Sequence, residues 1–270
     1  MPRISTLFVL GLGMVVAVPA EKAMAGGAVL DSTVITEATE VGRQIDVPTK
    51  EHPTYAVIHS GGRHDFGSAI AAKNSLSPEI LEQRIESALA GVHYLRADPG
   101  HPATLLIVFN WGIHAALGEA GNSTDPGYGN LLDRAALAGG SAFANDLKKV
   151  LSLNERVQAG TPTGLWDMPT LGATNASILF KSARPLEVFR RRDQLAENLL
   201  VQISSDCYYI VISAFDYSAT GQGKRQLLWR TKLTAAAPGL SMADAISSLV
   251  AQGSAYFGRS MNEAKFFSNR

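Results

Sequence analysis

The run Ala103-Thr104-Leu105-Leu106-Ile107-Val108-Phe109 decides the fold of this 270-residue chain. It is short and continuously apolar, and it follows a turn-rich segment, residues 98–102, so it predicts a β-strand covered on both faces. A second apolar stretch, residues 208–217, has Ile210, Val211 and Ile212 at its centre. Because both stretches need cover on both faces, we expect residues 105–109 and 210–212 to be neighbouring central strands of one sheet.

A helix is predicted between this strand and an earlier one. Ser77 is a good N-cap, and Pro78 fits the first helical position, so a helix is expected over residues 78–92. Residues 55–59 predict a short strand before it, and the strand–helix–strand order over residues 54–110 predicts parallel strands joined by a right-handed crossover. Apolar residues at helical spacing define the buried face of the helix: Leu81, Ile85, Leu89 and Val92.

The C-terminal part predicts a strand, a flexible turn at residues 220–223, a second strand over residues 227–233, and a helix. Trp229 is expected to face the core from an edge strand whose other face is wet. Ser241 caps the helix, and Asp244 adds a favourable negative charge to its first turn. An apolar stripe on the helix is expected to lie across the central strands: Met242, Ile246, Leu249, Val250, Gly253, Tyr256 and Phe257.

Less regular segments set the limits of the domain. Residues 26–52 lack a clear period and are interpreted as a flexible lead-in, and Gly61, Gly62 and Gly67 mark a loop. We expect an α/β (or α+β) fold, with one mixed β-sheet and helices packed on it. Its parts are a single domain over residues 53–260, a helical insertion at about residues 112–205 with helical patterns at 130–157 and 185–204, and a C-terminal tail at 261–270.

The N-terminus has the pattern of a secretory signal peptide. Arg3 supplies a basic start, and residues 4–18 form an uncharged apolar run. Two segments with small residues suited to signal-peptidase cleavage follow, at residues 18–20 and 23–25. We expect cleavage after Ala25, or alternatively after Ala20, and export to the periplasm or outside the cell as a soluble protein. A retained membrane anchor is the alternative, although the run is shorter than the ~20 apolar residues of a spanning helix.

Charge and cysteine content exclude some classes of protein. The chain has 24 basic and 24 acidic residues, and removal of residues 1–25 leaves 22 basic and 23 acidic. This balance argues against a nucleic-acid partner, which would favour a basic face. The single cysteine, Cys207, cannot form an intramolecular disulfide. It opens an apolar segment, so we interpret it as a buried strand thiol rather than a nucleophile.

The histidines gather in one part of the chain: His52, His59, His64, His93, His101 and His114. His59, His64 and Asp65 lie close together after the first predicted strand and are the candidate catalytic residues. They lack the helical i, i+4 spacing of zinc proteases, so no metal site is assigned, and surface or loop histidines are the alternative. An exported hydrolase or metal-dependent enzyme that uses this segment is the alternative function.

Other motifs are weak. No phosphate-binding glycine fingerprint and no Gly-x-Ser-x-Gly sequence occurs, and no cofactor is expected. Arg190, Arg191 and Arg192 form a basic run on a predicted helix, which would suit an anionic partner or form a solvated helix face. Asn122 and Asn175 fit the glycosylation sequon, which matters only in a eukaryotic source.

The C-terminal half resembles exported bacterial envelope α/β domains of unknown function, which are often lipoproteins. The resemblance rests on Tyr-Tyr-Ile-Val-Ile-Ser-Ala-Phe-Asp at 208–216, Leu-Leu-Trp-Arg at 227–230, Ala-Tyr-Phe-Gly at 255–258 and Leu-Ala-Gly-Val at 89–92. It implies an envelope location and a sheet-plus-helix domain, and it supplies no catalytic residues. The chain departs from the pattern because it lacks a lipidation cysteine and has a long helical middle.

The expected function is therefore a non-enzymatic binding or assembly module of the cell envelope. The sequence contains no recognisable catalytic motif, and the chain is long enough to form a complete hydrophobic core. The partner is unidentified, and another envelope protein is the natural candidate. We expect no nucleic acid partner and no membrane span after signal cleavage.

Overall fold

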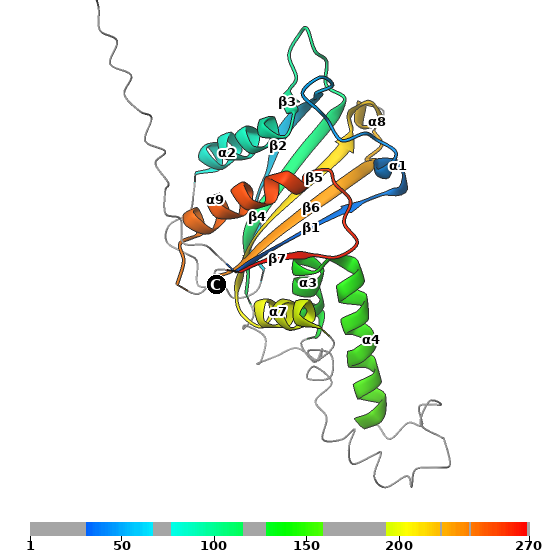
Figure 1. Cartoon of the computed structure of the whole chain (residues 1–270), viewed down its shortest axis with the longest axis vertical. Helices are drawn as coiled ribbons and strands as arrows, with labels where there is room; N and C mark the ends of the chain where they lie inside the picture. The colour runs from blue at the N-terminus through cyan, green and yellow to red at the C-terminus, as the bar shows by residue number, and fades with distance from the viewer. Residues whose placement is uncertain are drawn as a thin grey trace, which may run out of the picture.

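A mixed β-sheet organises the computed structural model, which describes residues 31–66, 77–115, 128–158, 193–221, 223–237 and 239–268 (Figure 1). Its strands are β1 (Ser32–Ala38), β2 (Thr54–Arg63), β3 (Tyr94–Arg96), β4 (Leu105–His114), β5 (Cys207–Asp216), β6 (Leu227–Ala236) and β7 (Lys265–Phe267). The described helices are α1 (Glu40–Arg43), α2 (Pro78–Gly91), α3 (Tyr128–Ala138), α4 (Gly140–Gln158), α7 (Gln194–Ile203), α8 (Tyr217–Gly221), α9 (Met242–Gly253) and the 3₁₀ helix η1 (Ser254–Tyr256).

The order of the strands confirms the expected α/β class. The seven described strands run β3-β2-β4-β5-β6-β1-β7; β2 is parallel to β3 and β4, and the remaining neighbours are antiparallel. Phe109 on β4 lies opposite Ile212 on β5, which confirms that these two apolar strands are neighbours. The prediction that Trp229 comes from an edge strand is wrong, because β6 lies between β5 and β1.

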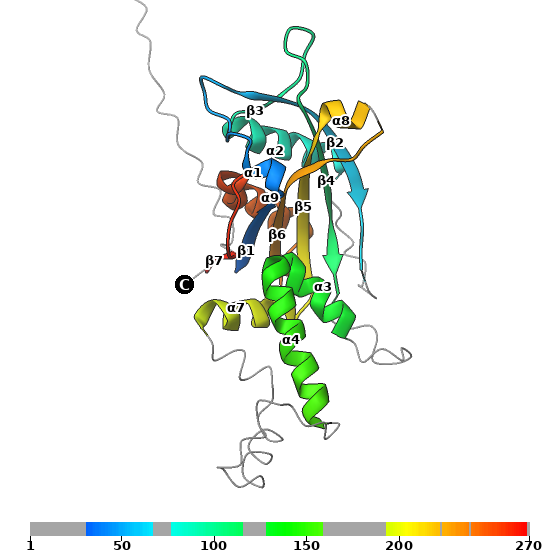
Figure 2. The same cartoon turned by 90° about the vertical axis from the view of Figure 1, so that its right-hand side faces the viewer.

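One face of the sheet is covered by α2 and α9, which lie side by side (Figures 1 and 2). The side chain of Ser77 accepts a hydrogen bond from Ile80 N–H and so begins α2 as predicted, and Ser241 caps α9 in the same way through Asp244 N–H. The sheet contacts of α9 are mainly with β5 and β6. Side chains of both helices join one buried cluster with the sheet: Leu81, Ile85, Leu89, Ile246, Leu249 and Val250.

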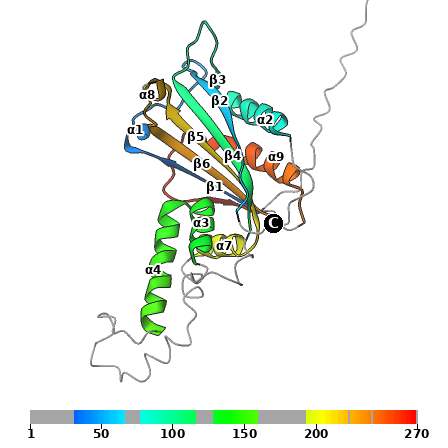
Figure 3. The same ribbon diagram turned by 180° about the vertical axis from the view of Figure 1, so that it is seen from behind.

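The opposite face is covered differently. Helices α3, α4 and α7 form a second core cluster with Ile35 of β1, and Figure 3 shows them at the end of the sheet where β4 finishes and β5 begins. Arg134 of α3 fixes this group, because its guanidinium donates to the carbonyls of Ile203 (2.6 Å) and Ala115 (2.8 Å). Burial lowers the pKa of Arg134.

The interpretation of residues 26–52 as a flexible lead-in is wrong over β1 and α1. Strand β1 pairs with both β6 and β7. Its sequence lacks apolar alternation because buried threonines face both sides. Thr33 hydrogen-bonds Thr234 (2.6 Å), and Thr36 hydrogen-bonds Thr231 (2.7 Å). Such cross-strand hydroxyl pairs stabilise a sheet without giving an apolar period.

The structure differs from the predicted segment boundaries at three further places. The predicted loop at residues 61–67 is strand up to Arg63, since a β-bulge between Ser60 and Gly62 absorbs the glycines. The insertion cannot begin at residue 112, because residues 112–114 finish β4. The tail at 261–270 contains β7, which extends the sheet through backbone pairing with β1. The predicted signal peptide at 1–25 and the basic run Arg190, Arg191 and Arg192 lie outside the described residues, as do Asn122 and Asn175.

A search of the described helices finds none that has both the length and the apolar content needed to cross a membrane.

Candidate functional site

The structure places Asp65 in a structural role. Its carboxylate pairs with the Arg63 guanidinium through two contacts, Nε to Oδ1 at 3.0 Å and Nη2 to Oδ2 at 2.9 Å. The same Oδ1 accepts the backbone N–H of Ile113 at 3.0 Å. These contacts join the end of β2 to β4, so the carboxylate acts as a brace between two strands.

His64 is held mainly through its backbone. Its carbonyl accepts the Tyr209 hydroxyl, which crosses over Gly112 of β4. The Nε2 atom of the His64 ring lies 3.1 Å from the carbonyl oxygen of Gly61. Burial raises the pKa of Tyr209 well above its ordinary value, so this hydroxyl stays protonated at neutral pH and remains a donor.

The predicted candidates His59, His64 and Asp65 do not form a metal centre. His59 is exposed on β2, in register with Val108, and the bulge separates it from the other two residues. Within the described ranges, no group of three histidine, cysteine or acidic side chains is placed to hold a metal ion. Two other histidines have local partners: His101 pairs with Asp98 and stacks on Tyr55, and His114 stacks on Phe66.

Cys207 is a buried strand residue, which agrees with its interpretation as a strand thiol. It is 2% exposed and lies opposite His114 on β4. Burial raises the pKa of its thiol to about 12, although the nearby charge of Arg134 acts in the opposite direction. A thiol with this pKa is almost wholly protonated at neutral pH and makes a poor nucleophile.

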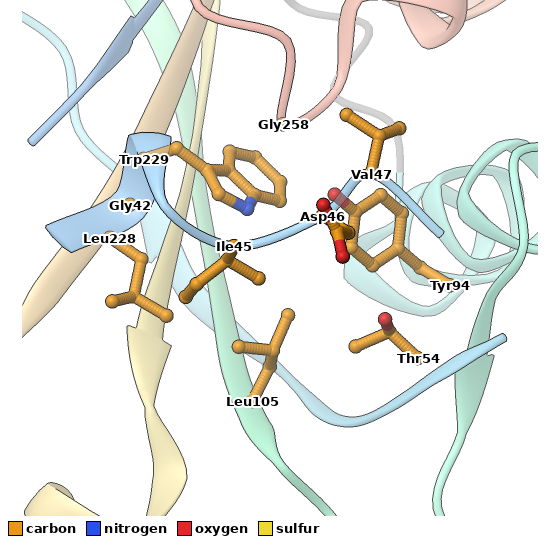
Figure 4. Close-up of a pocket in the computed structure, with 10 residues that line it drawn as sticks. All are labelled: Gly42, Ile45, Asp46, Val47, Thr54, Tyr94, Leu105, Leu228, Trp229 and Gly258. Carbon is orange, nitrogen blue, oxygen red and sulfur yellow. The ribbon is translucent and has the colours of Figure 1, made fainter. Parts of the chain in front are cut away.

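A small cavity lies where residues 42–47 cross β2, β3 and β6 (Figure 4). Its volume is about 10 Å³, which is room for one water molecule. Tyr94 and Trp229 form its walls, and burial raises the pKa of Tyr94 to about 12. Gly258 closes it with φ of +71°, and a Cβ there would lie 2.0 Å from the Tyr94 hydroxyl. The cavity is a packing site between the C-terminal segment and the sheet.

A larger cavity of about 280 Å³ lies beside β1, between Arg43, the turn from α3 to α4, and residues 260–262. Glu37 dominates its chemistry. One carboxylate oxygen accepts Ser141 N–H (2.7 Å) and the Ser141 hydroxyl (2.5 Å), and the other accepts Lys232 Nζ (2.7 Å). The carboxylate therefore already neutralises the positive N-terminal end of α4.

A third feature is the part of the second sheet face that the described helices leave uncovered. We call it the open face, and in Figure 3 it lies between α8 at one end and α3 and α4 at the other. Paired residues share a face, and the strand register places these residues on the open face: Val57, His59, Leu106, Val108, Asn110, Val211, Ser213, Phe215 and Arg230. Lys232, the partner of Val211, lies on the same side of the sheet, but its Nζ donates to the Ala136 carbonyl of α3 and to Glu37.

Apolar residues make the open face unusual. Val57 is 36% exposed, and Leu106, Val108, Val211 and Phe215 are partly exposed. Their neighbours on the covered face, such as Ile107 and Ile212, are fully buried. A sheet face in contact with water ordinarily carries polar side chains. The open face is therefore the strongest candidate for a binding surface in the described part of the chain.

Sequence reasoning did not identify Glu37 or Arg230 as site residues. It placed Arg230 and Lys232 correctly on the less buried side of their strand, and it expected cover on both faces of residues 105–109 and 210–212. A charged, less buried side of one strand beside two continuously apolar strands indicates a sheet face of mixed character, which is what the open face is. The missing information was that the described helices lie only at the ends of this face, α8 at one end and α3 and α4 at the other (Figure 3).

Comparisons with known proteins give little further guidance. No protein-family model matches the chain, and no curated protein matches it. Among solved structures, the chain is similar to a PDZ domain protein from Parabacteroides distasonis, with 10% sequence identity and a TM-score of 0.37. The similarity covers 87% of this chain and 39% of that one, so the chain spans about two fifths of the length of that protein. Neither an activity nor a ligand follows from a similarity of this size.

Proposed function

We propose that this protein is an exported binding or assembly module of the cell envelope and performs no catalysis. The basic start, the apolar run at residues 4–18 and the small residues before Gly26 support export. The roles of the candidate catalytic groups support a binding module: Asp65 braces β2 against β4, and the thiol of Cys207 is buried and protonated.

The observation that carries the proposal is the open face. Four central apolar side chains, Leu106, Val108, Val211 and Phe215, face outward where water-exposed sheets ordinarily carry polar residues. Apolar surface that stays in contact with water costs free energy in proportion to its area, so a face of this composition favours an occupant.

Metal analysis tests the metal-dependent form of the catalytic alternative. The purified mature protein should contain no stoichiometric zinc, and changing His64 to Ala should leave its metal content unchanged. A matched change of His52 to Ala, at an exposed position on the connection before β2, controls for nonspecific histidine binding. Stoichiometric zinc that is lost only in the His64 variant would defeat the binding-module proposal.

Intact mass of the exported protein tests the other half of the proposal. We expect an N-terminus at Gly26, or second best at Glu21. A variant that starts at Gly26 behind an initiator methionine should remain in the cytoplasm of the same host. A protein that still begins near Met1 and is extracted only by detergent would show that the apolar run is an anchor.

A further inference from the structure

Arg230 lacks the counter-charge that its position predicts. It lies directly opposite Glu37 in the β1–β6 pair, where opposite charges ordinarily form an ion pair. Both oxygens of Glu37 are instead taken by Lys232 and Ser141. Arg230 Nε donates to Ser213 Oγ at 3.0 Å, and no described carboxylate forms an ion pair with the guanidinium. The open face thus carries a positive charge that no described carboxylate neutralises.

The apolar residues lie to one side of this charge. Val108 is on the register row of Ser213 and Arg230, and Leu106 and Val57 continue the apolar surface over β4 and β2. Across neighbouring strands, about 4.8 Å apart, this surface extends ~14 Å from β6 to β2. An occupant that complements the face is anionic at the β6 end and apolar over β5, β4 and β2.

We propose that the open face binds a single-chain amphiphile with an oxyanion head, taken up as a monomer. The carboxylate or phosphate oxygens accept hydrogen bonds from the Arg230 guanidinium, whose planar fork matches either group. The aliphatic chain lies on Val108, Leu106 and Val57. This inference rests on the proposed binding function and names its ligand class.

The charge also argues against a second copy of the chain as the occupant. A two-fold face-to-face dimer whose axis runs across the strands, along the row of Arg230, Ser213 and Val108, would bring two Arg230 side chains together, with no described carboxylate between them to neutralise them. Like charges placed opposite each other across an interface oppose association. An anionic amphiphile removes this repulsion and covers the apolar surface at the same time.

Calorimetric titration of the purified mature protein tests the inference. The probes are dodecyl phosphate and laurate, each below the concentration at which it forms micelles. Both should bind, and whichever binds more tightly identifies the preferred head. Changing Arg230 to Gln should weaken binding by about tenfold or more, and changing it to Lys should restore part of the affinity. Changing exposed Arg225 to Gln alters the net charge equally and should leave affinity within about twofold.

A Val108→Ser variant tests the apolar half of the site, because a shorter polar side chain should weaken dodecyl phosphate but leave inorganic phosphate unaffected. Circular dichroism and Tm should establish that each variant is folded. Any of these results would overturn the inference: equal affinity for inorganic phosphate, equal affinity for uncharged dodecyl maltoside, binding to anionic phosphatidylglycerol vesicles without binding of monomers, or a dimer that excludes the probe. An exported, zinc-free protein that binds no amphiphile would overturn this inference alone, and the proposed function would stand.

Discussion

At the scale of single residues, the end of β2 depends on the missing side chain of Gly112. Tyr209 reaches the His64 carbonyl by crossing this glycine, and a Cβ there would lie 1.9 Å from that carbonyl oxygen. We predict that changing Gly112 to Ala destabilises the protein by about 1–3 kcal/mol, because backbone must shift and the Asp65 brace to Ile113 is disturbed. Urea denaturation measures the loss.

A matched control is Gly91, the last residue of α2. Apart from its chain neighbours and the backbone of the helix itself, no heavy atom lies within 4 Å of a Cβ built there. Changing Gly91 to Ala should leave stability unchanged or raise it by up to about 1 kcal/mol, since alanine is the better helix former. Equal effects of the two substitutions would show that the β2–β4 crossing has room for a side chain.

Cys207 gives a second residue-scale prediction. With a pKa of about 12, roughly one thiol in 10⁴ is ionised at pH 8, whereas an exposed cysteine ionises near pH 8.5. We expect Ellman's reagent to react with Cys207 only after guanidinium unfolding, and a Cys207→Ser variant to give no signal in either state. Native protein that reacts as fast as unfolded protein would contradict the burial of this strand.

At the scale of elements, apolar periodicity decided which predictions succeeded. The helix with Leu81, Ile85 and Leu89 was predicted to within one residue of α2, and both central strands were predicted. Strands β1 and β7 were missed for a physical reason. Thr33 and Thr36 of β1 are buried through hydroxyl pairs that only the partner strand supplies, and β7 is three residues long. Neither leaves a local pattern in the sequence.

The terminal helix carries the element-scale prediction. Leu249 of α9 is 1% exposed and belongs to the cluster shared with β5 and β6. Changing Leu249 to Ala should cost ~2–5 kcal/mol, a large part of a typical total stability of ~5–15 kcal/mol. Changing Val201 to Ala, on α7 and 59% exposed, should alter stability by less than about 0.5 kcal/mol. Thermal unfolding of the two variants decides the matter, and a Leu249 variant that melts like wild type would remove α9 from the core.

At the scale of the whole molecule, the two sheet faces differ in a way that the sequence described only in part. The apolar runs at residues 105–109 and 210–212 correctly predicted a shared sheet, and they also predicted cover on both faces. Apolar side chains predict that a sheet face is buried, but which helix or strand buries it depends on tertiary packing. The candidate residues give a second example, because the bulge between Ser60 and Gly62 separates His59 from His64 and Asp65 although the three are close in sequence.

The junction of β1, β6 and the α3–α4 turn supplies the last prediction, through Glu37. Burial by itself would raise the pKa of this carboxyl, but hydrogen bonds from Lys232 and Ser141 outweigh it, and the pKa lies below its ordinary value of 4.5. A carboxyl whose pKa is lower in the folded state stabilises the fold above its unfolded pKa, and it loses that contribution as the pH falls through the folded value.

Changing Glu37 to Gln should therefore cost about 1–2 kcal/mol at pH 7, because hydrogen bonds to a charged partner are lost, and the gap to wild type should shrink below about pH 4.5. Changing exposed Glu51 to Gln should leave the pH dependence of wild type unaltered. Urea denaturation from pH 7 to pH 3 measures both. A gap that stays constant over this range would mean that Glu37 holds α4 to the sheet through packing alone, and that its charge does not join the two layers.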